Sequence, residues 1–287
     1  MTTSSPIVWI AFNLGVIALI CFDAFVLNPA KREVTFRRAI AVTAFWILLA
    51  LSFNLFIYLW LGDKAALEFL AGYVVEQSLS VDNVFVFLLI FSHFKVPAQD
   101  QRKILLWGII SAQVLRAVFI IAGVAVLQHF HWMIYIFGGI LVFTGLKLFF
   151  KHDEEIHPED NPILKFVGKN ISKFWLVLIA IETTDLIFAV DSIPAILAIT
   201  KDSFIAYSSN IFAILGLRAM YFVLANFMKL FHLLHYGLGV ILTFIGVKML
   251  IEHWVHIPVI ATLGVILFTL TATVLASILW PLKSEQE

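Results

Sequence analysis

The sequence predicts an all-α fold, a polytopic membrane helix bundle of about nine transmembrane helices. Two properties of its composition support this prediction: 62% of the residues are hydrophobic and only 13% are charged, with a mean hydropathy of +1.00. A soluble domain is roughly 45–50% apolar. A chain of 287 residues with this composition would expose hydrophobic surface to water in any soluble fold. We therefore expect the lipid bilayer to be its main partner.

Apolar stretches of about 18 residues or more are long enough to cross the hydrocarbon core of a bilayer as helices. The chain contains a series of such stretches, and the first is not preceded by a positive region typical of a cleaved leader. The expected spans are 7–27, 39–61, 66–91, 104–128, 132–150, 174–199, 203–228, 232–251 and 257–280.

The lysines and arginines of the loops predict the orientation of the chain. If nine spans alternate, nearly all of these loop cations fall on one side, and Lys64 and Lys201 are the clear exceptions. Cytoplasmic loops carry the excess of Lys and Arg. We therefore expect a bacterial inner membrane protein with its N-terminus outside and its C-terminus in the cytoplasm.

The charge balance and the cysteine content exclude several classes of protein. Lys plus Arg equals Asp plus Glu at 19 each, so no basic excess points to a nucleic-acid partner. Cys21 is the only cysteine, which excludes an internal disulfide, an all-cysteine zinc site and an iron–sulfur cluster held by one chain. We expect no organic cofactor.

Two segments of the chain resemble each other in sequence. The run Glu76–Asn83 matches Asp185–Ser192, with an acid at the start of each run and Val-Asp near its end. Arg116-Ala117 then matches Arg218-Ala219. Further on, Tyr135, Gly138, Gly145 and Lys147 match Tyr236, Gly239, Gly246 and Lys248.

These matches recur in the same order, so the repeated unit has three helices and its two copies must be inverted in the membrane, as in many transporters. Lys147 and Lys248, each close to a span end, are expected to extend to opposite membrane interfaces. The predicted organisation is two N-terminal helices in 1–65, a first repeat in 66–150, an acidic cytoplasmic loop in 151–173, a second repeat in 174–256, and a final helix with its tail in 257–287.

Several charged residues fall inside the predicted spans, among them Asp23, Glu76, Asp82, Glu182, Asp185, Asp191, Arg116 and Arg218. Each such charge costs roughly 2.5–3.5 kcal/mol at the centre of a membrane helix on insertion scales. Two arginines can neutralise two of the six acids. The remaining acids must be protonated, hydrated or bound to cations.

The side chains around these acids predict which cation binds. They are oxygen donors, namely Gln77, Ser78, Ser80, Asn83, Thr183, Thr184 and Ser192. The histidines, in contrast, lie in loops or near span ends. Carboxylate, amide and hydroxyl oxygens suit Mg²⁺, Ca²⁺ and Mn²⁺. Pro194 is expected to kink or unwind its span at Asp191, because proline cannot donate a hydrogen bond to the carbonyl of Val190.

The runs Glu76–Asn83 and Glu182–Pro194 resemble the motifs of the TerC family of integral membrane proteins, which is named for tellurite resistance. The resemblance covers nearly the whole chain, because Asp23, the basic first loop, Trp46 and Arg116 also fit the family pattern. It implies export of Mn²⁺ and a role in metal homeostasis and resistance, since the family is grouped with LysE-type transporters. Plant members are linked to thylakoid membrane biogenesis, which implies membrane assembly as an alternative role.

The sequence therefore predicts a transporter and not an enzyme. We expect it to export a divalent cation, Mn²⁺ or otherwise Ca²⁺ or another hard cation, by alternating access with proton exchange. The expected ligands are Glu76, Asp82, Asn83, Glu182, Asp185 and Asp191. The expected secondary residues are Asp23, Ser80, Thr183, Thr184 and Ser192, with Arg116 and Arg218 offsetting charge or locking the metal-free state.

Two rival functions belong to other classes. An intramembrane aspartyl protease would use two acids sharing a proton, but the Tyr-Asp and Gly-x-Gly-Asp signatures of the presenilin type are missing around Asp82 and Asp191. A membrane-assembly or stress-resistance scaffold would use the acids as a structural metal site, with other membrane proteins or a second copy of the chain as partners. Metal transport into vesicles distinguishes a transporter from a scaffold.

Overall fold

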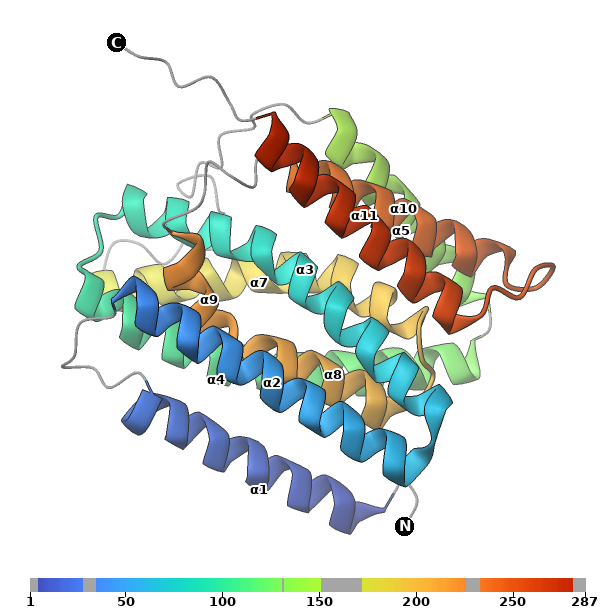
Figure 1. Cartoon of the computed structure of the whole chain (residues 1–287), viewed down its shortest axis with the longest axis horizontal. Helices are drawn as coiled ribbons and strands as arrows, with labels where there is room; N and C mark the ends of the chain where they lie inside the picture. Colours follow the sequence, from blue (N-terminus) through green and yellow to red (C-terminus); the bar gives the residue numbers. More distant parts are fainter. Residues whose placement is uncertain (1–4, 28–34, 131, 151–171, 226–232, 281–287) are drawn as a thin grey trace.

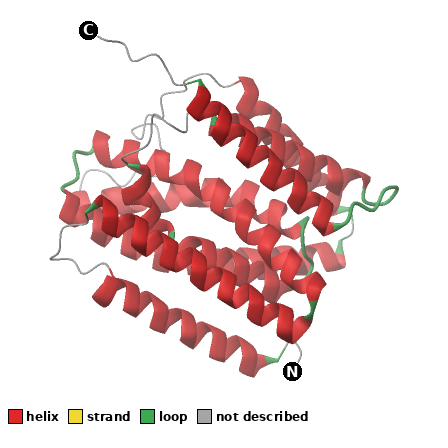
Figure 2. Ribbon diagram, in the orientation of Figure 1, coloured by secondary structure: helices red, strands yellow, loops and turns green. Residues whose placement is uncertain are grey.

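The computed structural model describes residues 5–27, 35–130, 132–150, 172–225 and 233–280. Within these ranges every regular element is a helix, which confirms the predicted all-α class (Figure 2). The elements are α1 (Pro6–Phe22), η1 (Asp23–Leu27), α2 (Phe36–Leu61), α3 (Asp63–His93), α4 (Ala98–His129), α5 (Met133–Phe150), α7 (Lys173–Leu197), α8 (Ser203–Leu215), α9 (Leu217–Leu224), α10 (Leu234–Ile251) and α11 (Val259–Leu279). Nearly all of the predicted acidic loop 151–173 lies outside the described residues.

Six of the described helices are long and apolar enough to cross a membrane: α1 with η1, α2, α3, α4, α10 and α11. The pair α8 and α9 makes a seventh if it is one bent span. α5 is apolar but shorter, and α7 is long enough but carries Glu182, Asp185 and Asp191. The structure is therefore a helical membrane protein with six or seven candidate spans in its described part, and the count of nine stays a prediction.

The centre of the bundle is formed by α3 and α8. α3 packs against α2, α7, α8, α9 and α11, and the helices run back and forth along one long direction of the molecule (Figure 1). α8 is buried from Phe204 to Leu215. Its first turn is fixed by Asp202, whose carboxylate accepts hydrogen bonds from the backbone N–H groups of Phe204 and Ile205 at 2.8 and 3.2 Å.

The predicted span 203–228 is not one straight helix. It bends by 44° between α8 and α9, and Gly216 occupies the break. A Cβ atom at this glycine would lie 3.4 Å from the Cβ of Trp46, so α2 packs closely against the bend. The bend determines the direction of α9, which carries Arg218.

The expectation that Pro194 unwinds its span is wrong. α7 is helical through Asp191 and Pro194 and ends at Leu197. Proline removes a single backbone hydrogen bond, and Pro194 lies in the last turn, where few intrahelical bonds follow it. The acids of α7 are consequently presented by a regular helix.

α5 and α10 pack closely through four glycines. A Cβ atom at Gly246 would lie 2.8 Å from the carbonyl oxygen of Gly138, and one at Gly239 would lie 2.9 Å from that of Gly145. Such close backbone approach is typical of small residues at membrane helix interfaces. Because residue numbers rise along α5 as they fall along α10, the two helices are antiparallel, as Figure 1 also shows.

Candidate functional site

Arg116 lies at the centre of a buried polar cluster within the bundle. One nitrogen of its guanidinium, Nη1, binds Glu76 Oε1 of α3, and the other, Nη2, lies 3.0 Å from Asp185 Oδ1 of α7. Asn210 of α8 accepts a longer hydrogen bond from Nη1 at 3.5 Å. Because Arg116 belongs to α4, four helices contribute to this Arg116 cluster.

The charges of the Arg116 cluster do not balance. Glu76, Asp185 and Arg116 are exposed by only 1%, 6% and 2%. Two carboxylates face one guanidinium, which leaves a formal excess of one negative charge if both acids are ionised. A buried charge is costly unless an opposite charge compensates it. The cluster is therefore suited to receive a proton or an additional cation.

Several buried polar atoms of the cluster have no hydrogen-bond partner within the described residues. They are Glu76 Oε2, Arg116 Nε and Asn210 Nδ2. Buried polar groups are normally hydrogen-bonded to protein or water. A cavity of about 20 Å³, lined by Arg116, Glu182 and Asp185 among other residues, lies beside the guanidinium and has room for about one water molecule.

Glu182 belongs to the edge of the Arg116 cluster. It precedes Asp185 by three residues, so both side chains project from one side of α7. Glu182 Oε1 accepts a hydrogen bond from Ser111 of α4 at 2.6 Å, and its other oxygen is buried without a partner in the described residues. Glu182 thus faces the same cavity as Arg116 but does not contact the guanidinium.

Asp191 lies apart from the Arg116 cluster. Its Oδ1 accepts a hydrogen bond from Thr144 of α5 at 2.8 Å. The neighbouring Ser192 is buried, and its hydroxyl has no partner within the described part of the chain. The side chain of Asp82 lies outside the described residues, so the expected approach of Asp82 to Asp191 stays a prediction.

Arg218 forms a separate ion pair. Its Nη1 lies 2.5 Å from Asp23 Oδ2, and both side chains are buried. Asp23 begins the π-helical segment η1, and Arg218 lies on α9 just after the bend at Gly216. One acid meets one guanidinium here, so this pair is formally neutral.

Ser80, Asn83, Thr183 and Thr184, which were also predicted to take part in the site, lie on the same two helices, α3 and α7. Ser80 and Asn83 are buried on α3. The hydroxyls of Thr183 and Thr184 donate to the carbonyls of Ile179 and Ala180, one turn earlier in α7. These hydroxyl oxygens retain lone pairs that can still accept a bond or bind a cation.

Among the side chains that the structure describes, no group of three or more His, Cys, Asp or Glu residues is placed to hold a metal ion. The described members of the predicted set therefore do not form a metal site in this conformation, in which Arg116 lies between Glu76 and Asp185, and the full six-residue site stays a prediction. The chemistry of the donors, carboxylate and amide oxygens, nevertheless fits a hard divalent cation as substrate. Arg116 would have to move before such an ion could bind both acids.

Sequence reasoning missed three residues that the structure places beside the predicted acids: Ser111, Thr144 and Asn210. Each is an uncharged polar residue inside a predicted apolar span, and that position is the signal that would have identified it. Ser and Thr in membrane helices frequently bond only to their own backbone, so the signal alone is weak.

Comparison with known proteins gives a consistent result. The model of the integral membrane protein TerC family matches residues 61–285. Alx of Escherichia coli strain K12, whose name describes a membrane-bound redox modulator, is 42% identical over 95% of this chain and 94% of its own length. An uncharacterised membrane protein of Myxococcus xanthus is 40% identical over 97% of this chain and 94% of its own. No solved structure matches the chain.

Proposed function

The chain belongs to the TerC family of integral membrane proteins, and we propose that it exports a divalent cation, with Mn²⁺ as the leading substrate, in exchange for protons. The observation that carries this proposal is the position of Arg116 between Glu76 and Asp185, the leading acids of the two repeated motifs. In a transporter the guanidinium would act as an internal counter-ion. It would hold the acids while no metal is bound and release them when the cation arrives.

Charge favours this exchange. With Arg116 in place, Glu76 and Asp185 keep a formal excess of one negative charge, and a divalent cation in its place would neutralise both acids. The donor atoms around these acids are oxygens, whereas zinc and copper favour nitrogen and sulfur ligands. Glu182, three residues before Asp185, lines the same cavity and offers a further carboxylate, and the amide oxygen of Asn210 already faces the guanidinium.

Binding the ion by all the predicted ligands requires a change of conformation. Asp191 bonds Thr144 of α5 in this structure and is separate from the Arg116 cluster. In the proposed cycle, α7 moves relative to α5 and brings Asp191, with Asp82 and Asn83 of α3, to the ion. Alternating access in transporters commonly involves such movement of one repeat against the other.

Two observations support the inverted repeat and the nine-span topology in this proposal. Gly138 packs against Gly246, and Gly145 packs against Gly239. The sequence match pairs Gly138 with Gly239 and Gly145 with Gly246. Exchanging the two copies therefore turns one contact into the other, as a twofold relation requires. In Figure 1 α1 begins at one end of the bundle and α11 finishes at the other. If α5 and α7 also cross the membrane, the termini fall on opposite sides.

Transport into sealed vesicles tests the proposal. Purified full-length protein, reconstituted in one known orientation, should move radioactive Mn²⁺ from the cytoplasmic to the outer face, faster with an opposing proton gradient. Asp185→Asn should abolish the movement. Asp100→Asn, which removes an acid that pairs with Lys103 near the start of α4, is the matched control. A scaffold with a structural metal site would bind Mn²⁺ without moving it, and that result would refute transport.

A further inference from the structure

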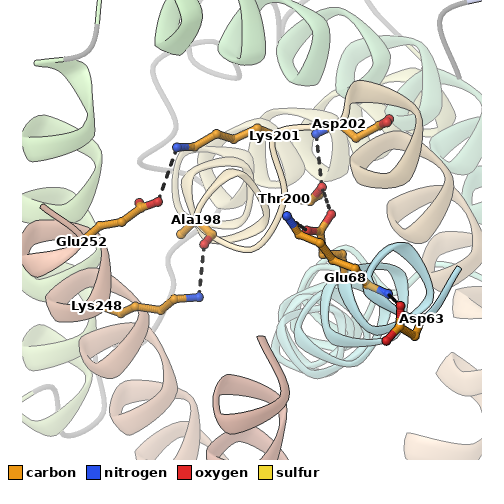
Figure 3. A network of polar contacts seen from close by, with 9 residues as sticks. Asp63, Glu68, Ala198, Thr200, Lys201, Asp202, Lys248 and Glu252 are labelled. Atoms are coloured by element: carbon orange, nitrogen blue, oxygen red, sulfur yellow. Dashed lines mark hydrogen bonds and ion pairs between the residues drawn. The ribbon is translucent and has the colours of Figure 1, made fainter. Parts of the chain in front are cut away.

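A second polar region lies at one end of the bundle, away from the Arg116 cluster. It surrounds a cavity of about 220 Å³, which we term the end cavity. The end cavity lies where α3 and α11 begin and where α7 and α10 end (Figures 1 and 3). Its charged and hydroxyl-bearing lining residues include Lys64, Glu68, Thr200, Lys201, Lys248 and Glu252.

The two glutamates of the end cavity already have partners. Glu68 accepts a hydrogen bond from Thr200 at 2.6 Å and lies 4.0 Å from the ammonium of Lys64. Glu252 lies 3.4 Å from the ammonium of Lys201. The lining contains three lysines and two glutamates, so with His256 neutral it has a formal excess of one positive charge.

Lys248 supplies this excess charge. It is only 8% exposed, so its ammonium is enclosed by the protein at this end of the bundle, and its expected position at the membrane interface stays a prediction. Its ammonium donates one long hydrogen bond of 3.5 Å to the carbonyl of Ala198 at the end of α7, as Figure 3 shows. The nearby Glu68 and Glu252 attract its charge, but they form their ion pairs with Lys64 and Lys201. The three lysines and two glutamates still leave one positive charge in excess, which an anion would compensate.

Three features define what such an anion would meet. Lys64 and Lys201, with side chains 84% and 70% exposed, stand at the rim and can turn toward a ligand. Val259, the first residue of α11, lines the end cavity, and the first N–H groups of a helix favour an anion. The volume of the end cavity exceeds that of several water molecules, so a multi-oxygen anion fits.

The end cavity also lies at the level expected for lipid headgroups. Trp132 and Trp254, which are 57% and 73% exposed, adjoin the helix ends on this side of the bundle, and Trp60 lies at the end of α2. Tryptophan concentrates at membrane–water interfaces. An anion could therefore reach Lys248 from the aqueous phase or from the bilayer.

We propose that the end cavity is a binding site for a phosphate-type anion, with the Lys248 ammonium as its central ligand and Lys64 and Lys201 at its rim. A phosphate group carried by a free ion or by a phospholipid headgroup offers the same oxygens. The site shares no residue with the Arg116 cluster, so it stands whether or not the chain transports a cation.

Binding to purified full-length protein tests this site, in delipidated detergent solution without divalent metal. Inorganic phosphate is titrated by calorimetry, and retention of phosphatidylglycerol against phosphatidylcholine is measured by native mass spectrometry. Lys248→Met keeps the length of the side chain and removes its charge. Lys103→Met removes an exposed ammonium near the start of α4, outside the end cavity, and is the control.

We expect phosphate affinity to fall at least tenfold in Lys248→Met and to stay unchanged in Lys103→Met. This result would identify the ligand of the end cavity as a soluble anion. Retention of phosphatidylglycerol that depends on Lys248, without binding of inorganic phosphate, assigns a headgroup and also supports the site. Should Lys248→Met fail to fold, Lys201→Gln should weaken the same binding severalfold. Absence of binding in both assays, or equal binding by wild type and the cavity variants, would overturn the proposal.

Discussion

Arg116 and Arg218 carry the same signal in the sequence, an Arg-Ala pair inside an apolar segment, yet their surroundings differ in the structure. Arg116 lies between two carboxylates, Glu76 and Asp185, from two helices. Within the described residues Arg218 forms an ion pair with one acid, Asp23, and the buried Arg102 lies near it. A guanidinium with two acids leaves negative charge for another cation, whereas the Arg218 pair leaves none. We therefore propose exchangeable binding at the Arg116 cluster and a structural role for the Arg218 pair.

The largest effect should come from removing either arginine. Arg116→Met and Arg218→Met each remove the guanidinium from a buried ion pair, and breaking a buried ion pair costs roughly 3–5 kcal/mol. Only the first variant should regain stability when Mn²⁺ is added, because only it leaves two acids facing one position. Thermal unfolding of both proteins with and without metal measures this difference. Equal rescue of the two variants would remove the distinction between the pairs.

A smaller effect should follow from neutralising one acid of each pair. Asp185→Asn retains shape and hydrogen bonding but should lower Mn²⁺ transport more than tenfold, because a neutral amide is a poor substitute for a carboxylate ligand. Asp23→Asn should destabilise the protein while transport, normalised to the amount of folded protein, changes less than twofold. Vesicle uptake corrected for protein abundance checks both. Severe loss of normalised transport in Asp23→Asn would place Asp23 among the ligands.

Asp191 tests whether the metal site extends beyond the Arg116 cluster. Asp191→Asn should insert normally, because it removes a charge from the membrane. Transport should fall about tenfold, equivalent to about 1.4 kcal/mol in binding. Thr144→Val removes the hydrogen bond to Asp191 without removing its charge, and should reduce transport less. If Asp191→Asn transports at the wild-type rate, Asp191 is not a ligand.

The smallest effect is expected at Asn210, the amide beside Arg116. Asn210→Ala should weaken Mn²⁺ binding about threefold, since it removes one neutral oxygen from the Arg116 cluster. Ser208, also fully buried in α8, bonds only the carbonyl of Ile205, and Ser208→Ala should leave metal affinity unchanged. Calorimetric titration of both variants with Mn²⁺ shows whether Asn210 belongs to the site. Equal affinities would exclude Asn210 from it.

Some of the structure followed directly from the sequence. Composition and the long apolar stretches predicted an all-helical membrane bundle, because the backbone N–H and C=O groups of a chain in lipid must be hydrogen-bonded internally and helices achieve this. The cost of burying charge predicted that Arg116 would find acidic partners, and it did. Glu76 and Asp185, which the predicted repeat makes equivalent, both bind the same guanidinium, and the inverted repeat itself stays a prediction.

Other features depend on packing that a sequence does not specify. The choice of Asp23 as the partner of Arg218 requires the bend at Gly216 and the direction of α9. Lys248 lies near a helix end, which suggested exposure, but the ends of α3, α7 and α11 cover it. Pro194 was expected to break α7, yet the lost hydrogen bond falls in the last turn, where the helix tolerates it.

In the proposed transport cycle, Arg116 and the cation compete for Glu76 and Asp185. Equilibrium binding of Mn²⁺ to purified wild type and Arg116→Met, followed by electron paramagnetic resonance, tests this competition. Removing the guanidinium raises the formal negative charge facing the cation, so Mn²⁺ should bind Arg116→Met at least tenfold more tightly than wild type. An affinity that is unchanged or lower in Arg116→Met would contradict competition and assign Arg116 a purely structural role.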